Sequence, residues 1–273
     1  MASAGRSFAR SGPSAGLVAY AVAMYLFLYA PIAVILVLSV NDSTVVGFPF
    51  RGFTLKWFWT VFTSADLLQA TANSLVLGVA SATIATVLAL SLALAFRRDF
   101  ALKSALLNLI LVPIILPGIV SGAVLVVVFG LAGVELSLWT SALVAHVTFV
   151  LPFAFLNLYP RLHNFDASIE EAARDLGATP RLVLTKIVLP IIRPGIVAAA
   201  LFAFSLSFDE FVRTLLLVGF DRTLPVQFWY MIVESLAPEA PAMAVLIIAI
   251  SVVSSLLGFV LSARGPKGAT TGS

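Results

Sequence analysis

The sequence of 273 residues contains no cysteine and only two histidines, His146 and His163. Without thiols the chain cannot form disulfide frameworks, thiolate metal sites or thiol nucleophiles. The two histidines are too few and too far apart to indicate a metal site. Charge is also scarce, because Asp, Glu, Lys and Arg make up 11% of the residues, against about 25% in a typical soluble domain. So little charge excludes intrinsic disorder, which needs a polar, charged chain.

Apolar residues dominate what is present. They form 61% of the sequence, and the mean hydropathy is +1.09. A water-soluble protein of this length could not bury that much apolar surface. The composition therefore excludes a water-soluble globular enzyme and predicts a chain that crosses a lipid bilayer.

Six apolar runs are long enough for a helix to cross a bilayer core about 30 Å thick, which takes about 20 residues. The predicted spans cover residues 16–40, 70–96, 105–130, 139–158, 195–218 and 242–263. The first run is too long for the apolar region of a signal peptide, so we expect it to remain as a span. The sequence thus predicts an all-α polytopic membrane protein, with a six-span domain over 16–263 between tails at 1–15 and 264–273.

Basic residues predict the orientation of these spans, because cytoplasmic loops are enriched in Lys and Arg. Twelve lie on the side that holds both termini: Arg6, Arg10, Arg97, Arg98, Lys103, Arg161, Arg174, Arg181, Lys186, Arg193, Arg264 and Lys267. Three lie on the other side: Arg51, Lys56 and Arg222. We therefore expect both termini in the cytoplasm. The net charge of +3 is then a topology signal, and no nucleic-acid partner is expected.

The longest cytoplasmic segment, residues 166–195, carries signals for two short helices. Asp166 or Ser168 can cap the first helix, because short polar side chains accept hydrogen bonds from the free N–H groups of a helix start. Gly177 lies where a left-handed residue would end it.

The second helix of this segment has its own signals. Thr179 and Pro180 form a cap followed by proline at the first helical position, where the missing N–H costs nothing. Pro190 and Pro194 are expected to close the segment before the fifth span. The pattern predicts a helix, a glycine turn and a second helix, which in the simplest interpretation only connects two spans.

Seven residues of this segment match the spacing of a known motif. They are Glu171, Ala172, Ala173, Gly177, Ile187, Leu189 and Pro190. This spacing resembles the EAA loop of permease subunits of ABC importers. The stretches GFTLKW (52–57), LPFAFLNLYPRL (151–162) and SFDEFVRTLLLVG (207–219) are similar to the spermidine/putrescine type of these permeases. The resemblance extends over nearly the whole chain.

The resemblance implies a type I ABC importer permease fold in the bacterial inner membrane. It implies that the chain pairs with a second permease as a heterodimer, with two copies of a cytoplasmic ATPase and with a periplasmic substrate-binding protein. The EAA loop is the implied coupling element, which sits in a groove of the ATPase. The chain lacks the Gly-rich phosphate-binding motif, so no cofactor is expected on it. ATP and Mg would bind the partner ATPase, and this chain by itself would not be an enzyme.

Three charged residues, Asp209, Glu210 and Arg213, lie inside the fifth predicted span. Charges in a bilayer are costly and usually functional, so they need partners or water. One interpretation is a local pair between Asp209 and Arg213, which share a face four residues apart. Another is a translocation pathway in which an acid attracts a cationic solute. An alternative function is a self-contained secondary transporter that uses the three charges as a proton or ion relay.

Three further residues are candidates for the pathway. Pro117 and Gly118 predict a kinked, pathway-lining helix in the third span. The spermidine-type subunit has an acid after that proline, where this chain has Gly118, so the solute is either a polyamine or a less cationic amino-acid derivative or opine-like compound. Trp57 matches an aromatic of the family and offers either a cation–π face or an interfacial anchor. His146 is expected to hydrogen-bond between helices.

Overall fold

The computed structural model describes residues 14–263. Residues 1–13 and the predicted tail at 264–273 lie outside the described residues. The described chain is helical, and its β pairing is limited to an isolated bridge between Asn41 and Phe53. This agrees with the predicted all-α class.

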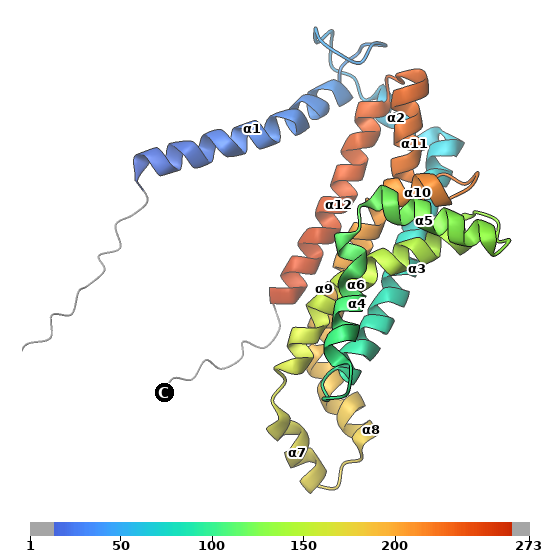
Figure 1. The fold of residues 1–273 in the computed structure, drawn as a ribbon. Helices are drawn as coiled ribbons and strands as arrows, with labels where there is room; N and C mark the ends of the chain where they lie inside the picture. The colour runs from blue at the N-terminus through green and yellow to red at the C-terminus, as the bar shows by residue number, and fades with distance from the viewer. Residues whose placement is uncertain (1–13, 264–273) are drawn as a thin grey trace, which may run out of the picture.

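Twelve α-helices and three π-helical turns follow one another along the described chain (Figure 1). The α-helices are α1 (Ala15–Ser39), α2 (Lys56–Thr63), α3 (Ala65–Ala95), α4 (Lys103–Ile115), α5 (Gly118–Leu131), α6 (Leu143–His163), α7 (Ala167–Asp175), α8 (Pro180–Val183), α9 (Leu189–Phe208), α10 (Val212–Leu217), α11 (Leu224–Tyr230) and α12 (Ala240–Ala263). The π-helical turns are η1 (Leu138–Ala142), η2 (Leu184–Val188) and η3 (Met231–Ser235).

Among the described residues, five helical stretches are long and apolar enough to cross a membrane, and a sixth exists if α4 and α5 count as one bent span. The predicted third span over 105–130 is sharply bent, and α4 and α5 meet at an angle of 105°, which confirms the kink predicted at Pro117 and Gly118. Proline explains the break. Leu116 adopts an extended conformation with ψ 126°, as the residue before a proline prefers, and α5 starts directly after Pro117.

The predicted fifth span over 195–218 is also interrupted. The helix α9 ends at Phe208, and α10 starts at Val212. The side chain of Glu210 accepts a hydrogen bond from the backbone N–H of Arg213 at 3.0 Å, in the manner of a helix cap. The charged residues therefore lie at a helix break rather than inside a regular helix.

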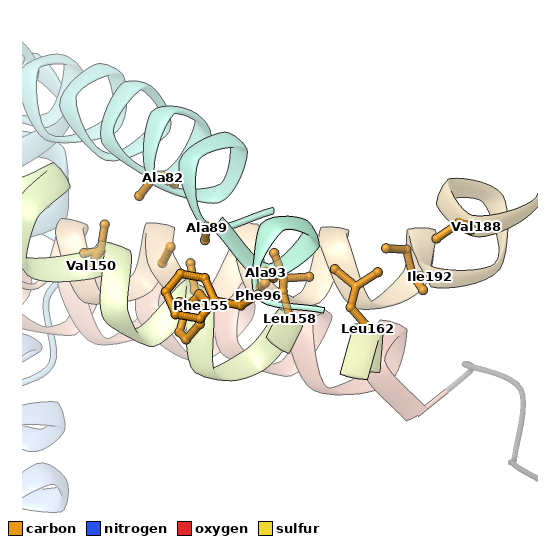
Figure 2. Close-up of a cluster of buried hydrophobic side chains, with 14 of the residues drawn as sticks. Ala82, Ala89, Ala93, Phe96, Val150, Phe155, Leu158, Leu162, Val188 and Ile192 are labelled. Atoms are coloured by element: carbon orange, nitrogen blue, oxygen red, sulfur yellow. The ribbon is translucent and has the colours of Figure 1, made fainter. Parts of the chain in front are cut away.

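A bundle of long helices forms the core of the molecule. The helix α3 packs against α6 and α9, and α12 packs against α9. Small side chains allow the close approach, as in many membrane bundles: Ala85, Ala89 and Ala93 of α3 are fully buried. Figure 2 shows α3 alanines facing Phe155, Leu158 and other apolar side chains in one buried cluster.

The first helix stands apart from this bundle. In Figure 1, α1 extends away from the other helices and approaches them at its C-terminal end, where it contacts α12. Its most apolar stretch has none of its residues buried. Such an apolar surface suits lipid or a second membrane chain. The short helices α7 and α8 lie at the end of the bundle opposite to α2 and α11 (Figure 1).

Candidate functional site: a coupling loop and a buried polar cluster

The coupling loop, residues 166–195, starts with the expected cap. The side chain of Asp166 accepts a hydrogen bond from the backbone N–H of Ser168 at 3.0 Å, so Asp166 rather than Ser168 is the capping residue. Hydrogen bonds from Ser168 lower the pKa of the Asp166 carboxyl below its ordinary value. The dipole of α7 also stabilises this negative charge at the start of the helix.

Gly177 ends α7 with a left-handed turn, as predicted. Its φ is +87°, a conformation that glycine adopts without a steric penalty. The N–H of Gly177 donates to the carbonyl of Arg174 at 2.8 Å, and the N–H of Ala178 donates to that of Ala173 at 3.0 Å. These two bonds form a Schellman motif. Thr179 then caps α8, and Pro180 occupies its first turn, which confirms both predictions.

The second helix of the loop does not end at Pro190 or Pro194, so the prediction that these prolines close the segment is wrong. The chain continues through α8, the turn η2 and α9 as one helical stretch, Pro180–Phe208. Pro190 lies in the first turn of α9, and Pro194 lies inside that helix. Proline removes an i→i−4 hydrogen bond, and the wider π-helical turn directly before Pro190 accommodates this loss. The loop is therefore rigidly joined to α9.

The two neighbouring glutamates of α7 point to different surroundings. Glu171 is exposed together with Ala172 and Leu176, and Leu176 is 89% exposed. Glu170 is buried and pairs with two arginines, Arg97 after α3 and Arg174 of α7. The loop thus presents Glu171 outward and is held by Glu170 inward.

The anchor formed by Glu170 was missed by sequence reasoning. In the sequence, Arg97 contributes to the prediction of the orientation of the spans. Nothing in the sequence relates it to a residue in the next cytoplasmic loop. The guanidinium of Arg97 also lies 5.7 Å from the ring centre of Phe165, within cation–π range. The remaining motif residues line the junction with α9: Ile187 and Leu189 are half-buried, and Pro190 is exposed.

The α9–α10 polar cluster surrounds the helix break. It consists of Ser81, Ser121, His146, Ser207, Asp209, Glu210, Arg213, Thr214 and Ser251. The pair between Asp209 and Arg213, one of the two interpretations of the sequence, does not form. Arg213 instead pairs with Glu210, with Nη1 2.7 Å from Oε2 and both side chains less than 10% exposed. The break removes the i,i+4 geometry on which the prediction depended.

Arg213 is enclosed by two other helices, α5 and α6. Its Nε donates to Ser121 of α5 at 2.9 Å, and its guanidinium lies 4.1 Å from the ring centre of Phe149 of α6. A Cβ added to Gly118 would lie 3.3 Å from Arg213 Nη1. The structure thus brings Gly118, directly after Pro117, against Arg213, although they lie in different predicted spans.

Asp209 lies on the other side of the break from this ion pair. It is exposed and accepts a hydrogen bond from the Ser251 hydroxyl of α12. No ion pair to Asp209 occurs among the described residues, for which five salt bridges are recorded. Because Arg213 neutralises Glu210, the net charge of the break resides on Asp209.

His146 of α6 forms hydrogen bonds between helices, as predicted. The ring is 1% exposed. Its Nδ1 lies 2.7 Å from Ser207 Oγ of α9, and its Nε2 lies 2.8 Å from Thr214 Oγ1 of α10. Ser207 Oγ in turn lies 2.7 Å from Ser81 Oγ of α3. Small hydroxyl residues in apolar helices were the available sequence signal, but their partners could not be assigned from it.

Trp57 belongs to a different buried cluster. It is 8% exposed, and its Nε1 donates to the backbone carbonyl of Asn41 at 2.8 Å. Lys56 Nζ lies 4.5 Å from the centre of its ring, so its own neighbour already offers the ring a cation. The cluster also holds Phe208, the last residue of α9. Trp57 and the last residue of α9 therefore share one apolar cluster beside the helix break.

The two regions offer charged groups that can bind a cation or a partner protein. No group of three or more metal-ligating side chains occurs within residues 14–263. The polar cluster offers one open carboxylate inside an otherwise apolar bundle, which can attract a cation. The coupling loop offers an exposed carboxylate and an exposed leucine to a partner.

Comparison with known proteins identifies the family. The family described as "Binding-protein-dependent transport system inner membrane component" matches residues 85–264. The spermidine/putrescine transport system permease protein PotC of Escherichia coli (strain K12) is 35% identical over 253 residues, which cover 92% of this chain and 95% of the relative. The putrescine transport system permease protein PotI of the same strain is 31% identical over 255 residues, with 89% of each chain covered.

Solved structures show the same fold at low sequence identity. A chain of a bacterial alginate ABC transporter, in complex with a periplasmic protein that binds an alginate pentasaccharide, matches with a TM-score of 0.70 and 17% identity over 92% of this chain and 93% of the other. A chain of the inward-facing MetNI methionine ABC transporter matches with a TM-score of 0.56 and 17% identity, covering 77% and 99%. The described helices and these matches define a multi-pass inner-membrane protein with the fold of ABC importer permeases. The chain belongs to the family of inner membrane components of binding-protein-dependent transport systems.

Proposed function

We propose that this chain is the transmembrane permease subunit of an ATP-driven importer for a polyamine such as spermidine or putrescine. Its partners are a second permease, two copies of a cytoplasmic ATPase and a periplasmic binding protein. Both termini face the cytoplasm, which places α7 and α8 on the ATPase side. The relatives that cover about nine-tenths of the chain are permeases of polyamine systems by name, and this supports the solute class.

The coupling loop is the contact for the ATPase. It projects from the bundle (Figure 1) and presents Glu171 and Leu176 to solvent. Its inward side is tied to the end of α3 by Glu170 and Arg97, and its second helix continues into α9. A push on the loop therefore moves α9, and with it the helix break that holds the charged residues.

Asp209 is the acid that a cationic solute meets in the membrane. This assignment rests on one observation: Glu210 is neutralised by Arg213, while the exposed Asp209 carboxylate has the uncharged Ser251 as its side-chain partner within residues 14–263. Arg213, Pro117 and Gly118 then shape the wall beside it, and Trp57 supports the end of α9 through packing with Phe208. The absence of an acid at Gly118 leaves Asp209 as the main negative charge at the break.

Reconstitution of the assembled transporter in proteoliposomes tests this proposal. We expect uptake of labelled putrescine or spermidine that requires ATP and the binding protein and that persists when a protonophore collapses the proton gradient. An uncharged or anionic amino-acid derivative should not compete. Uptake by this chain alone, driven by a proton gradient, would instead support a secondary transporter, a function that the family membership does not favour. Competition by an opine but not by putrescine would overturn the solute class.

A further inference from the structure

The buried histidine at the helix break joins the helices on both sides of the break. His146 of α6 contacts Ser207 at the end of α9 and Thr214 in α10, so its two ring nitrogens bond to the helices on either side of the break. Ser207 extends the contact to Ser81 of α3. The ring is almost fully buried, and burial strengthens the penalty for leaving either nitrogen without a partner.

The hydrogen-bond partners determine which ring nitrogen carries the proton. The Thr214 hydroxyl has one proton, which it donates to the backbone carbonyl of Glu210 at 2.7 Å. Thr214 can therefore only accept from the ring, so His146 Nε2 is the donor. The assignment of a proton to Nε2 holds whether or not Nδ1 is also protonated.

The other side of the ring completes a directed chain. A cationic ring would place a second positive charge in the buried site of Arg213, whose only anionic partner among the described residues is Glu210. Neutral imidazole avoids this cost. Nδ1 then accepts from the Ser207 hydroxyl, and Ser207 accepts from Ser81. The Ser81 hydroxyl also lies 2.7 Å from the Leu77 carbonyl and 3.1 Å from the Gly78 carbonyl. Both carbonyls are inside α3, where the helix ladder supplies them with backbone N–H donors, so the Ser81 proton is free for Ser207. The chain of donors runs from α3 through α9 and α6 to α10 and ends on the Glu210 carbonyl.

We propose that His146, held as its neutral Nε2–H tautomer, is a positioning residue that fixes the ends of α9 and α10 relative to each other. Because the break between those ends carries Asp209 and Glu210, the histidine sets where the two acids lie. The claim about the tautomer rests on the hydrogen bonds and on the buried charge of Arg213, and is independent of the proposed function. The claim about the acids rests on the proposed function, in which they line the pathway.

Nitrogen NMR of the assembled complex, with ¹⁵N-histidine introduced only into this chain, tests the tautomer. The chain has two histidines, and exposed His163 at the end of α6 is an internal control. At pH 8 we expect one signal set with protonated Nε2 and unprotonated Nδ1 for His146. Thr214→Val removes the acceptor and should shift His146 towards the Nδ1–H tautomer without changing His163. A wild-type Nδ1–H tautomer, or no response to Thr214→Val, would overturn the proposal.

Transport kinetics test the positioning role separately. His146→Phe fills the space but removes both hydrogen bonds, and we expect KM for the solute to rise at least tenfold. His146→Gln keeps one donor and one acceptor and should recover a substantial part of that loss, while His163→Gln behaves as wild type. An unchanged KM in an assembled His146→Phe complex would contradict the role. If wild-type uptake itself fails, the proposed function is wrong, and the NMR result still decides the tautomer.

Discussion

The coupling loop and the α9–α10 polar cluster both surround a junction between two helices, but their charges face different environments. In the loop, Glu171 and Asp166 are exposed, and the turn is held by bonds between near neighbours. In the cluster, Arg213 and Glu210 are buried, and His146 bonds to residues more than sixty positions away. A surface built from local bonds can move as one body, whereas a buried network fixes several helices together. The local bonds suit the coupling loop to receiving force from a partner. The buried network suits the polar cluster to handling a solute.

The largest effect is expected from breaking the buried ion pair. Arg213→Gln leaves Glu210 as an uncompensated charge, and removing one partner of a buried pair costs about 3–5 kcal/mol. We expect loss of the assembled complex or a strongly lowered thermal midpoint in detergent. The double variant Arg213→Gln/Glu210→Gln removes both charges and should recover much of the stability. A single variant as stable as wild type would show that the pair is not needed.

The next effect concerns the inward anchor of the loop. Arg97→Gln removes one of the two charged partners of Glu170 and leaves Arg174. Hydrogen bonds to charged groups are worth about 1.5–3 kcal/mol. We expect faster hydrogen exchange of the α7 amides and reduced uptake. The charge swap Arg97→Glu/Glu170→Arg should restore part of both.

Lys103→Gln is the matched control for Arg97, because Lys103 pairs with the exposed Asp99. The partner cation lowers the pKa of Asp99, but exposed pairs contribute little to stability. We expect no change in α7 exchange in this variant. Equal effects of the two substitutions would contradict a specific anchor.

A smaller but selective effect is expected at Gly177. Gly177→Asp places a residue with a Cβ in a left-handed turn with φ +87°, at a cost of about 1–2 kcal/mol, and adds a charge to the coupling surface. We expect insertion and assembly to persist and uptake to fall at least tenfold. Gly133→Asp is the control, since Gly133 also has a positive φ (+66°) and open space around it. Similar losses of uptake in both variants would mean that backbone strain alone is responsible.

The smallest effect is expected at the cap of α7. The pKa of Asp166 is lowered in the folded loop, so its stabilisation is full above the ordinary pKa and is lost as the pH falls through the lowered value. At pH 7, Asp166→Ala should increase the exchange of the first α7 amides roughly severalfold. Asp166→Asn retains the accepting oxygen and should change them less. The reverse order would contradict a capping role.

The two regions also differ in how far the sequence predicts them. The cap, the glycine turn and the second cap of the loop depend on residues within 166–180, so local rules identify them. The ion pair of Arg213 depends on a helix break that no periodicity indicates. The partners Ser81, Ser121 and Ser251 lie on other helices. Nothing in the sequence distinguishes these serines from the other serines of the apolar runs. Apolar run lengths likewise indicated the spans but not the bend between α4 and α5, although Pro117 marked its place.

One measurement tests the division of tasks most directly: uptake and solute-stimulated ATP hydrolysis recorded in the same vesicles for Gly177→Asp and Asp209→Asn. The account predicts that Gly177→Asp abolishes the stimulation of ATP hydrolysis by solute and binding protein. It predicts that Asp209→Asn raises the solute concentration needed for half-maximal uptake about tenfold while the solute carried per ATP stays unchanged. If Asp209→Asn uncouples hydrolysis from uptake, or Gly177→Asp changes only the solute requirement, the assignment of coupling to the loop and solute handling to the polar cluster is wrong.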